Sequence, residues 1–257
     1  MSYRILAILV VGLLLLGGWW FWPASDDGTL AEIQRRGTLR IGLDASFPPF
    51  ETITADNQIV GLDIDIANAV AADLGVTLEI VNIGFDGLYD ALLARRVDLV
   101  ISGLPYDPHW TEDVAYTHNY FNAGQVLIIQ DNNQTITSID DLDNKIVSIE
   151  WGSQADMEAR QLERQMTNIT LLRQETAAQA LDMVLTQQAD ASIVDGVTGV
   201  GAVPRGIKII TYLTDEWYAA AVHIESQALL KAVNRSLEQL DESGGMAALQ
   251  AKWLHSN

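Results

Sequence analysis

Residues 63–83, DIDIANAVAADLGVTLEIVNI, contain the pattern that decides the fold class. Residues 63–75 space their apolar side chains as an amphipathic helix and end at a glycine, a common helix terminator. Residues 76–83 then form an apolar run typical of a strand, and a similar run, TLRIGLD, precedes the helix at residues 38–44. Strand, helix and strand in this order predict a right-handed crossover in a mostly parallel sheet.

The same alternation continues along the chain and repeats in its second half. Residues 177–196 indicate a helix, a turn and a strand, which echo the helix and strand expected over residues 87–103. Between them we expect a short capped helix at 138–144, a strand at 145–151, a helix at 153–165 and a strand at 169–175. The sequence therefore predicts two α/β lobes, with a ligand site in the cleft where the strand ends of both lobes meet.

The N-terminus predicts export from the cytoplasm. Residues 5–22 are uncharged, and as a helix they would extend roughly 27 Å, close to the hydrocarbon core of about 30 Å. Trp19, Trp20 and Trp22 stand where an interfacial aromatic belt would lie, and Arg4 stands on the expected cytoplasmic side. An uncleaved N-terminal transmembrane helix is the first interpretation. A cleaved signal peptide is the alternative, although it would place bulky Trp22 where cleavage requires a small residue.

Charge and cysteine content exclude several classes of function. The formal net charge of −19 would repel nucleic-acid phosphate, so no nucleic-acid partner is expected. The absence of cysteine excludes disulfides, thiolate nucleophiles, cysteine metal sites and a lipid-modified cysteine. We expect no cofactor and no metal.

Six stretches in order carry a resemblance to a known family. They are LRIGLDASFPPFE, IVGLDIDIANAVAADLGV, GFDGLYDALLARRVDLVISGL, SIDDLDNKIVSIEWGS, ADASIVDG and LLKAVNRSLEQLDESGGMAALQAKW. Together they resemble family 3 extracellular solute-binding proteins, the amino-acid receptors of ABC importers. The resemblance implies a two-lobed clamp of the periplasmic-binding-protein type, hinged at two crossover strands over residues 124–130 and 218–224. The implied division is a membrane anchor or signal at 1–23, a linker and first helix at 24–37, lobe 1 at 38–125 and 218–257, and lobe 2 at 126–217.

The resemblance also implies a ligand site. The positions that match the family's contacts for the ligand amino group are Asp44 and Asp195, and the aromatic positions are Phe47 and Phe85. On the second lobe, the polar start of a helix matches Ser153 and Gln154, where free N–H groups could accept an anionic group.

The loop ISGLPYDPHWTEDVAYT, residues 101–117, departs from the family pattern. After Gly103, the position of a family hydroxyl residue is Pro105, and the position of the arginine that clamps the ligand carboxylate is Trp110. Proline has no N–H and indole has one neutral donor, so the loop is expected to present an aromatic surface instead. Arg95 or Arg96 could replace the lost clamp, but both are expected to face solvent.

Each candidate residue also has a purely structural interpretation. Asp195 could cap a turn, Ser153 could cap a helix, Trp110 could cover the lobe surface, and Trp151 is as compatible with packing as with a pocket wall. We expect Phe50 in the core and Phe47 in the pocket. The lone His109 is expected to have no special role.

The expected function is capture of a small polar, amino-acid-like or amine-bearing solute for an ABC-transporter permease. The protein is expected to act as an extracytoplasmic monomer held at the membrane, and not as an enzyme. A ligand-sensing receptor domain is one alternative, and an enzyme resembling cyclohexadienyl dehydratase is another.

Overall fold

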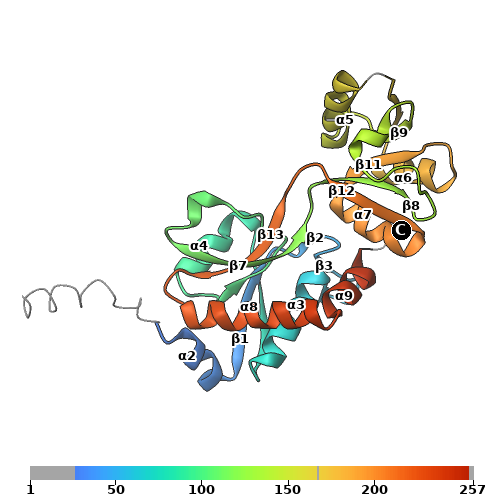
Figure 1. Ribbon diagram of the computed structural model, residues 1–257. Helices are drawn as coiled ribbons and strands as arrows, with labels where there is room; N and C mark the ends of the chain where they lie inside the picture. Colours follow the sequence, from blue (N-terminus) through green and yellow to red (C-terminus); the bar gives the residue numbers. More distant parts are fainter. Residues whose placement is uncertain (1–26, 167, 255–257) are drawn as a thin grey trace, which may run out of the picture.

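A computed structural model describes residues 27–166 and 168–254, which form two lobes joined by two extended connections (Figure 1). Each lobe is built on a five-stranded mixed sheet. The expected membrane segment at residues 1–23 lies outside the described residues. Within the described ranges, no helix has both the length and the apolar character needed to cross a membrane.

The lobe 1 sheet has the strand order β5-β1-β6-β13-β7. Strand β1 pairs in parallel with β5 and β6, whereas β13 runs antiparallel to its neighbours β6 and β7. The strands are β1 (Thr38–Leu43), β5 (Thr77–Asn82), β6 (Leu99–Val100), β7 (Val114–Asn122) and β13 (Trp217–His223). A small antiparallel sheet of β2 (Ser46–Phe47), β3 (Glu51–Ile53) and β4 (Ile59–Val60) lies between β1 and α3 in the chain.

Helices cover both faces of the lobe 1 sheet. Leu39, Ile41 and Leu43 alternate along β1 and are fully buried, so they point to one face, where they join a core with residues of α2, α3, α8 and α9. The other face packs against α4. The helices are α2 (Thr29–Arg36), α3 (Leu62–Asp73), α4 (Leu88–Leu93), α8 (Gln227–Glu242) and α9 (Gly245–Trp253), with short 3-10 turns η1 (Phe85–Gly87) and η2 (Pro108–Trp110).

Lobe 2 repeats this plan with the strand order β10-β9-β11-β8-β12. Its reversed strand is β8, which pairs antiparallel with β11 and β12. Helix α5 packs on one face of the sheet, and α6 and α7 pack on the other. The elements are β8 (Gln125–Gln130), η3 (Ile139–Leu142), β9 (Ile146–Glu150), α5 (Gln154–Gln165), β10 (Thr170–Gln174), α6 (Ala177–Leu185), β11 (Ala191–Asp195), α7 (Gly196–Ala202), η4 (Val203–Arg205) and β12 (Ile207–Tyr212).

The predicted alternation of strands and helices is confirmed in both lobes. The helix expected at 63–75 is α3, the strand at 76–83 is β5, and the short capped helix at 138–144 is η3 with a full capping box. Strand β6 is shorter than the run at 97–103 suggested. Strands β7 and β12 and the small sheet were not predicted.

Two connections carry the chain between the lobes, from β7 to β8 and from β12 to β13 (Figure 1). They lie against each other, because Ala123 N donates to Glu216 O at 2.8 Å and Leu213 N donates to Gln125 O at 2.7 Å. Asn122 links the two connections by a side-chain hydrogen bond, since its amide donates to Asp215 Oδ1 at 2.8 Å. The reversed strand of each sheet, β13 or β8, therefore begins where the chain arrives from the other lobe.

Candidate functional site

A pocket of about 300 Å³ opens at the carboxyl edge of the lobe 1 sheet. Asp44 follows β1, Phe85 follows β5, and Gly103 lies just beyond β6. The residues that follow three parallel strands therefore lie together in the lining of this pocket. Open α/β sheets usually bind ligands at this edge. The complete lining is Asp44, Ser46, Phe47, Phe85, Ser102, Gly103, Pro105, Glu216 and Tyr218.

Backbone contacts fix Asp44 within this pocket. Its N–H donates to Ser102 Oγ at 3.0 Å, and its Oδ2 accepts from Phe85 N at 2.9 Å. The carboxylate is thereby anchored to the loop that follows β5, and the Asp44 backbone is anchored to the loop that follows β6. This arrangement presents a partly exposed negative charge from a rigid position.

Aromatic rings form a second wall of the pocket. Phe47 is 43% exposed and Phe85 is 44% exposed, whereas Phe50 behind them is fully buried. The rings of Phe47 and Phe50 stack at 5.4 Å. Gly103 has a φ of +49°, and a Cβ there would lie 2.6 Å from Phe47 Cε1, so only glycine allows this ring position.

Lobe 2 offers a smaller pocket of about 60 Å³ at the matching edge of its sheet. Asp195 ends β11, and its carboxylate caps α7 by accepting from Thr198 N and Thr198 Oγ1, each at 2.8 Å. Ser153 caps α5, because its Oγ accepts from Asp156 N at 3.3 Å. The complete lining is Gln125, Glu150, Ser153, Ala155, Ala177, Ile193, Val194 and Asp195.

The structure places the remaining lobe 2 candidates at the rim. Gln154 is exposed at the first position of α5. Trp151 is 71% exposed and lines neither pocket. The indole therefore stands in solvent, directly after Glu150 of the lobe 2 pocket.

Both pockets border the connections between the lobes. Glu216 and Tyr218 of the lobe 1 pocket lie at the start of β13, and Gln125 of the lobe 2 pocket begins β8. Both pockets therefore lie at the side of their lobe where the chain crosses to the other lobe. Four carboxyl groups line them, namely Asp44, Glu216, Glu150 and Asp195, and the described lining residues include no lysine or arginine.

Trp110 does not join this site. Its ring stacks on Tyr89 of α4 at 4.3 Å with an interplanar angle of 13°. The Tyr89 hydroxyl contacts the Tyr116 hydroxyl at 2.6 Å, so the indole covers a polar aromatic cluster on the side of lobe 1. The expected place of Trp110 is therefore corrected: it has the structural role that the sequence left open, whereas Phe47 and Phe85 line the lobe 1 pocket.

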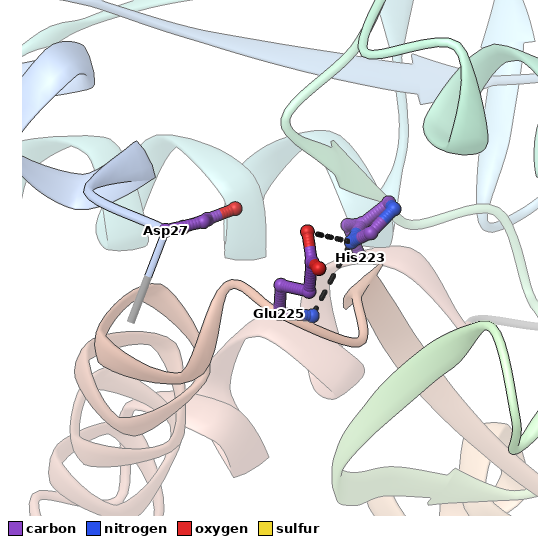
Figure 2. A group of neighbouring side chains, drawn as sticks. All are labelled: Asp27, His223 and Glu225. Carbon is purple, nitrogen blue, oxygen red and sulfur yellow. Dashed lines mark hydrogen bonds and ion pairs between the residues drawn. The ribbon is translucent and has the colours of Figure 1, made fainter. Parts of the chain in front are cut away.

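Arg95 and Arg96 also lie away from the lobe 1 pocket. Arg96 is exposed, and Arg95 contacts a cluster of Asp27, His223 and Glu225. Figure 2 shows the three side chains of this cluster. Arg95 Nη2 lies 3.1 Å from His223 Nδ1 and 3.0 Å from Glu225 Oε2. Neither arginine is placed to replace the lost carboxylate clamp.

The same cluster has the composition of a metal site, because three potential ligand atoms lie within 4.8 Å of one another. However, His223 Nδ1 accepts from both Arg95 and Glu225 N, the latter at 3.2 Å. Although burial opposes it, hydrogen bonds from Thr29 and Arg95 hold the pKa of Asp27 well below its usual range. The guanidinium thus already supplies the cation that this cluster requires.

A larger hollow of about 590 Å³ lies at the opposite end of lobe 2. The hollow lies at the amino edge of the parallel strands, because its lining includes Ile146 at the start of β9 and Gln130 at the end of the antiparallel β8. Ligands of open α/β sheets bind at the carboxyl edge instead. This hollow is therefore not the candidate site.

Sequence reasoning did not find Glu150, Glu216 or Tyr218 as lining residues. Glu150 ends β9 immediately before Trp151, and Glu216 stands just before β13. An acidic residue at the end of a predicted strand was the available signal for Glu150. No local signal marks Glu216, because its place depends on how the two connections pair.

Two α/β lobes, each with a pocket at the carboxyl edge of its sheet beside the connections, are typical of a clamp that binds a small molecule. The sequence model of "Bacterial extracellular solute-binding proteins, family 3" matches residues 39–256, and the chain belongs to this family. The family consists of solute-binding proteins and not of enzymes.

Several relatives are similar over nearly their whole length. The "L-cystine-binding protein TcyJ" of Escherichia coli is 27% identical over 95% of this chain and 92% of its own. The "Putative ABC transporter arginine-binding protein 2" of Escherichia coli is 28% identical over 84% of this chain and 90% of its own. The solved "Ancestral Cationic Amino Acid Solute Binding Protein (AncCDT-1)" is 31% identical, covers 88% of this chain and 99% of its own, and has a TM-score of 0.61.

Proposed function

We propose that the protein captures a small solute whose amine or other cationic group dominates recognition, and that it delivers this solute to the permease of an ABC importer. The observation that supports this proposal is the set of four carboxyl groups and no lysine or arginine among the described pocket-lining residues. An arginine-binding relative and a cationic amino-acid-binding structure are consistent with this charge preference.

A ligand carboxylate would find few donors in lobe 1. Gly103 N already donates to Asp63 Oδ2 at 2.5 Å, and Tyr106 N donates to Trp217 O at 2.9 Å. Ser102 Oγ donates to Glu51 at 2.6 Å, and Pro105 has no N–H. A buried carboxylate without a charged partner is strongly unfavourable, so the ligand is an amine or an amino acid with a modified carboxyl group.

The candidate residues then take distinct roles. Asp44 and Asp195 oppose the cationic group from the two lobes, while Phe47, Phe85 and Trp151 supply ring faces. Cation–π contacts contribute roughly 0.5 to 2 kcal/mol each. Gly103 forms the floor, and Ser153 and Gln154 contribute polar contacts from the start of α5.

The lobes close over the ligand by bending at the two connections, a hinge motion of the kind that two-lobed clamps use. The moving units are lobe 1, residues 38–125 and 218–257, and lobe 2, residues 126–217. The closed monomer is the form that the permease receives.

Calorimetry with matched ligand pairs tests this function. The purified full-length protein is titrated with L-arginine and with agmatine, which differ by the α-carboxylate, and with L-lysine and cadaverine, which differ in the same way. We expect each diamine-type ligand to bind at least tenfold more tightly than its amino acid, because only the amino acid must bury a carboxylate. Tighter binding of L-arginine than of agmatine would contradict the proposal.

Single substitutions then assign the binding to the cleft. Asp195→Asn keeps a side-chain oxygen for the α7 cap but removes the charge, and it should weaken agmatine binding roughly ten- to hundredfold, since hydrogen bonds to charged groups contribute about 1.5–3 kcal/mol. Glu112→Gln is the matched control, because Glu112 is exposed and lines neither pocket. Equal losses in both variants would show that net charge, and not this site, governs affinity.

We also propose that the mature protein keeps its N-terminal segment and is held at the outer face of the membrane by it. The uncharged run at residues 5–22 and the absence of cysteine support this proposal. Intact-mass analysis of the protein from its host membranes is expected to give the full chain, with Trp19–Trp22 present. A mass that corresponds to a start near Ser25 would establish cleavage.

A further inference from the structure

Two buried carboxyl groups lie directly behind the lobe 1 pocket. Glu51 of β3 and Asp63 of α3 are both 0% exposed. Glu51 Oε1 accepts from Ser102 Oγ at 2.6 Å, and Asp63 Oδ2 accepts from Gly103 N at 2.5 Å. Ser102 and Gly103 both line the pocket, so the two acids hold its floor from behind.

One oxygen of each group remains without a partner from the described residues. These atoms are Glu51 Oε2 and Asp63 Oδ1. Each carboxyl group shifts the pKa of the other, so the two lie within interaction distance, and a contact between two carboxyl groups is favourable only if one of them carries a proton. A single shared proton therefore accounts for the contact and avoids placing two like charges together in a buried site.

The chemistry of the surroundings assigns the proton to Glu51. Burial and then the charge of Asp63 raise the pKa of Glu51 to about 10. Burial also raises the pKa of Asp63, but only to about 6, because the Gly103 N–H and the Tyr120 hydroxyl stabilise its anion. Asp63 is thus the acceptor and Glu51 the donor across the neutral range.

Among the residues that the structure describes, the ionisable groups beside the pair supply no compensating positive charge. Asp44 raises the pKa of Glu51 further, and Tyr120 of β7 donates to Asp63 Oδ2 at 2.9 Å. Burial raises the pKa of Tyr120 and of Tyr218 on β13, so both hydroxyls stay neutral. On the outer face of α3, Lys252 of α9 is already paired with Asp65 at 2.6 Å.

We propose that Glu51 and Asp63 are positioning residues that hold one proton between them and thereby fix Ser102 and Gly103 in the floor of the ligand pocket. Loss of this proton at alkaline pH places a second negative charge in the buried site and releases the loop. This inference depends on the proposed function only in describing Ser102 and Gly103 as part of a ligand pocket. The tests of the shared proton need no ligand, so their failure is distinguishable from a failure of the proposed function.

The first test follows the Gly103 amide by NMR in glycine-labelled full-length protein between neutral and alkaline pH. In the wild type we expect this resonance to shift with a single alkaline transition. In Glu51→Gln, whose amide donates to Asp63 and cannot ionise, the transition should vanish, whereas the exposed control Glu79→Gln should keep it. A transition in Glu51→Gln equal to that of the wild type would overturn the proposal.

The second test uses the unaltered sequence and does not depend on how the variant folds. Infrared spectroscopy with isotope-labelled glutamate should detect a protonated glutamic acid at pH 7 that disappears at strongly alkaline pH. Its absence at pH 7 would overturn the proposal.

Thermal unfolding provides a third test. Because the pKa of Glu51 is raised, the stability from its protonation is fully present below the ordinary value of 4.5 and is lost as pH rises toward about 10. The wild-type melting temperature should therefore fall between pH 7 and pH 9 more steeply than that of Glu51→Gln, and parallel slopes would contradict the proposal.

Discussion

Replacing Phe50 with alanine is expected to lower the free energy of unfolding by about 3–5 kcal/mol, the usual range for a fully buried phenylalanine. Phe50 is 0% exposed, and its ring lies 5.3 Å from those of both Phe121 and Tyr218. These partners lie on β7 and β13, so the ring joins the small sheet to the reversed strand of lobe 1. Chemical denaturation measures the loss.

Phe47→Ala is the matched control, since the two rings stack but Phe47 is 43% exposed. We expect little change in stability and a roughly three- to thirtyfold weaker affinity for agmatine, from the loss of one cation–π contact. If Phe47→Ala destabilised the fold as much as Phe50→Ala, Phe47 would be a core residue and not a pocket wall.

Gly124→Ala should be the most disruptive substitution at the inter-lobe connections. An added Cβ would lie 2.0 Å from Thr214 O and 3.0 Å from Asn122 Oδ1, so it would collide with both connections. Because one of these atoms belongs to the backbone, a rotamer change cannot relieve the contact. We expect a loss of about 3 kcal/mol in the free energy of unfolding, as for a severe case of overpacking.

Gly84→Ala provides the control for this experiment. Gly84 has a φ of −58°, which alanine adopts readily, and a Cβ there would meet nothing within 4 Å. Its free energy of unfolding should not fall. A similar loss in both variants would indicate that glycine content, and not the contact with Thr214, determines the effect.

The fold was predictable because its signals are local. The helix α3 follows from apolar spacing over residues 63–75, and the capping box at Ser138 marks η3. The pairing of β7 with β13 was not predictable, because no local pattern links residues about one hundred positions apart.

The candidate site was predictable in part, and mainly from family resemblance. Asp44, Phe47, Phe85 and Gly103 do line one pocket. Trp110 was misplaced because the direction of its ring depends on the η2 turn and on the flat surface of Tyr89, which the sequence does not reveal. Glu51 and Asp63 look like ordinary surface acids in the sequence, and only the packing of β3 on α3 shows them buried together.

The reversed strand β13 determines the order in which the two lobes can fold as the chain is synthesised. Within the described part of the chain, β7 lies at the sheet edge and pairs with β13 alone, which separates it from β6. When the first 122 residues emerge, lobe 1 still lacks the strand that must fill this gap, whereas all five strands of the lobe 2 sheet come from the uninterrupted stretch 125–212. A chain that emerges N-terminus first therefore has all the strands of lobe 2 before it has those of lobe 1. Lobe 1, although it begins earlier in the sequence, is the last of the two to complete its sheet.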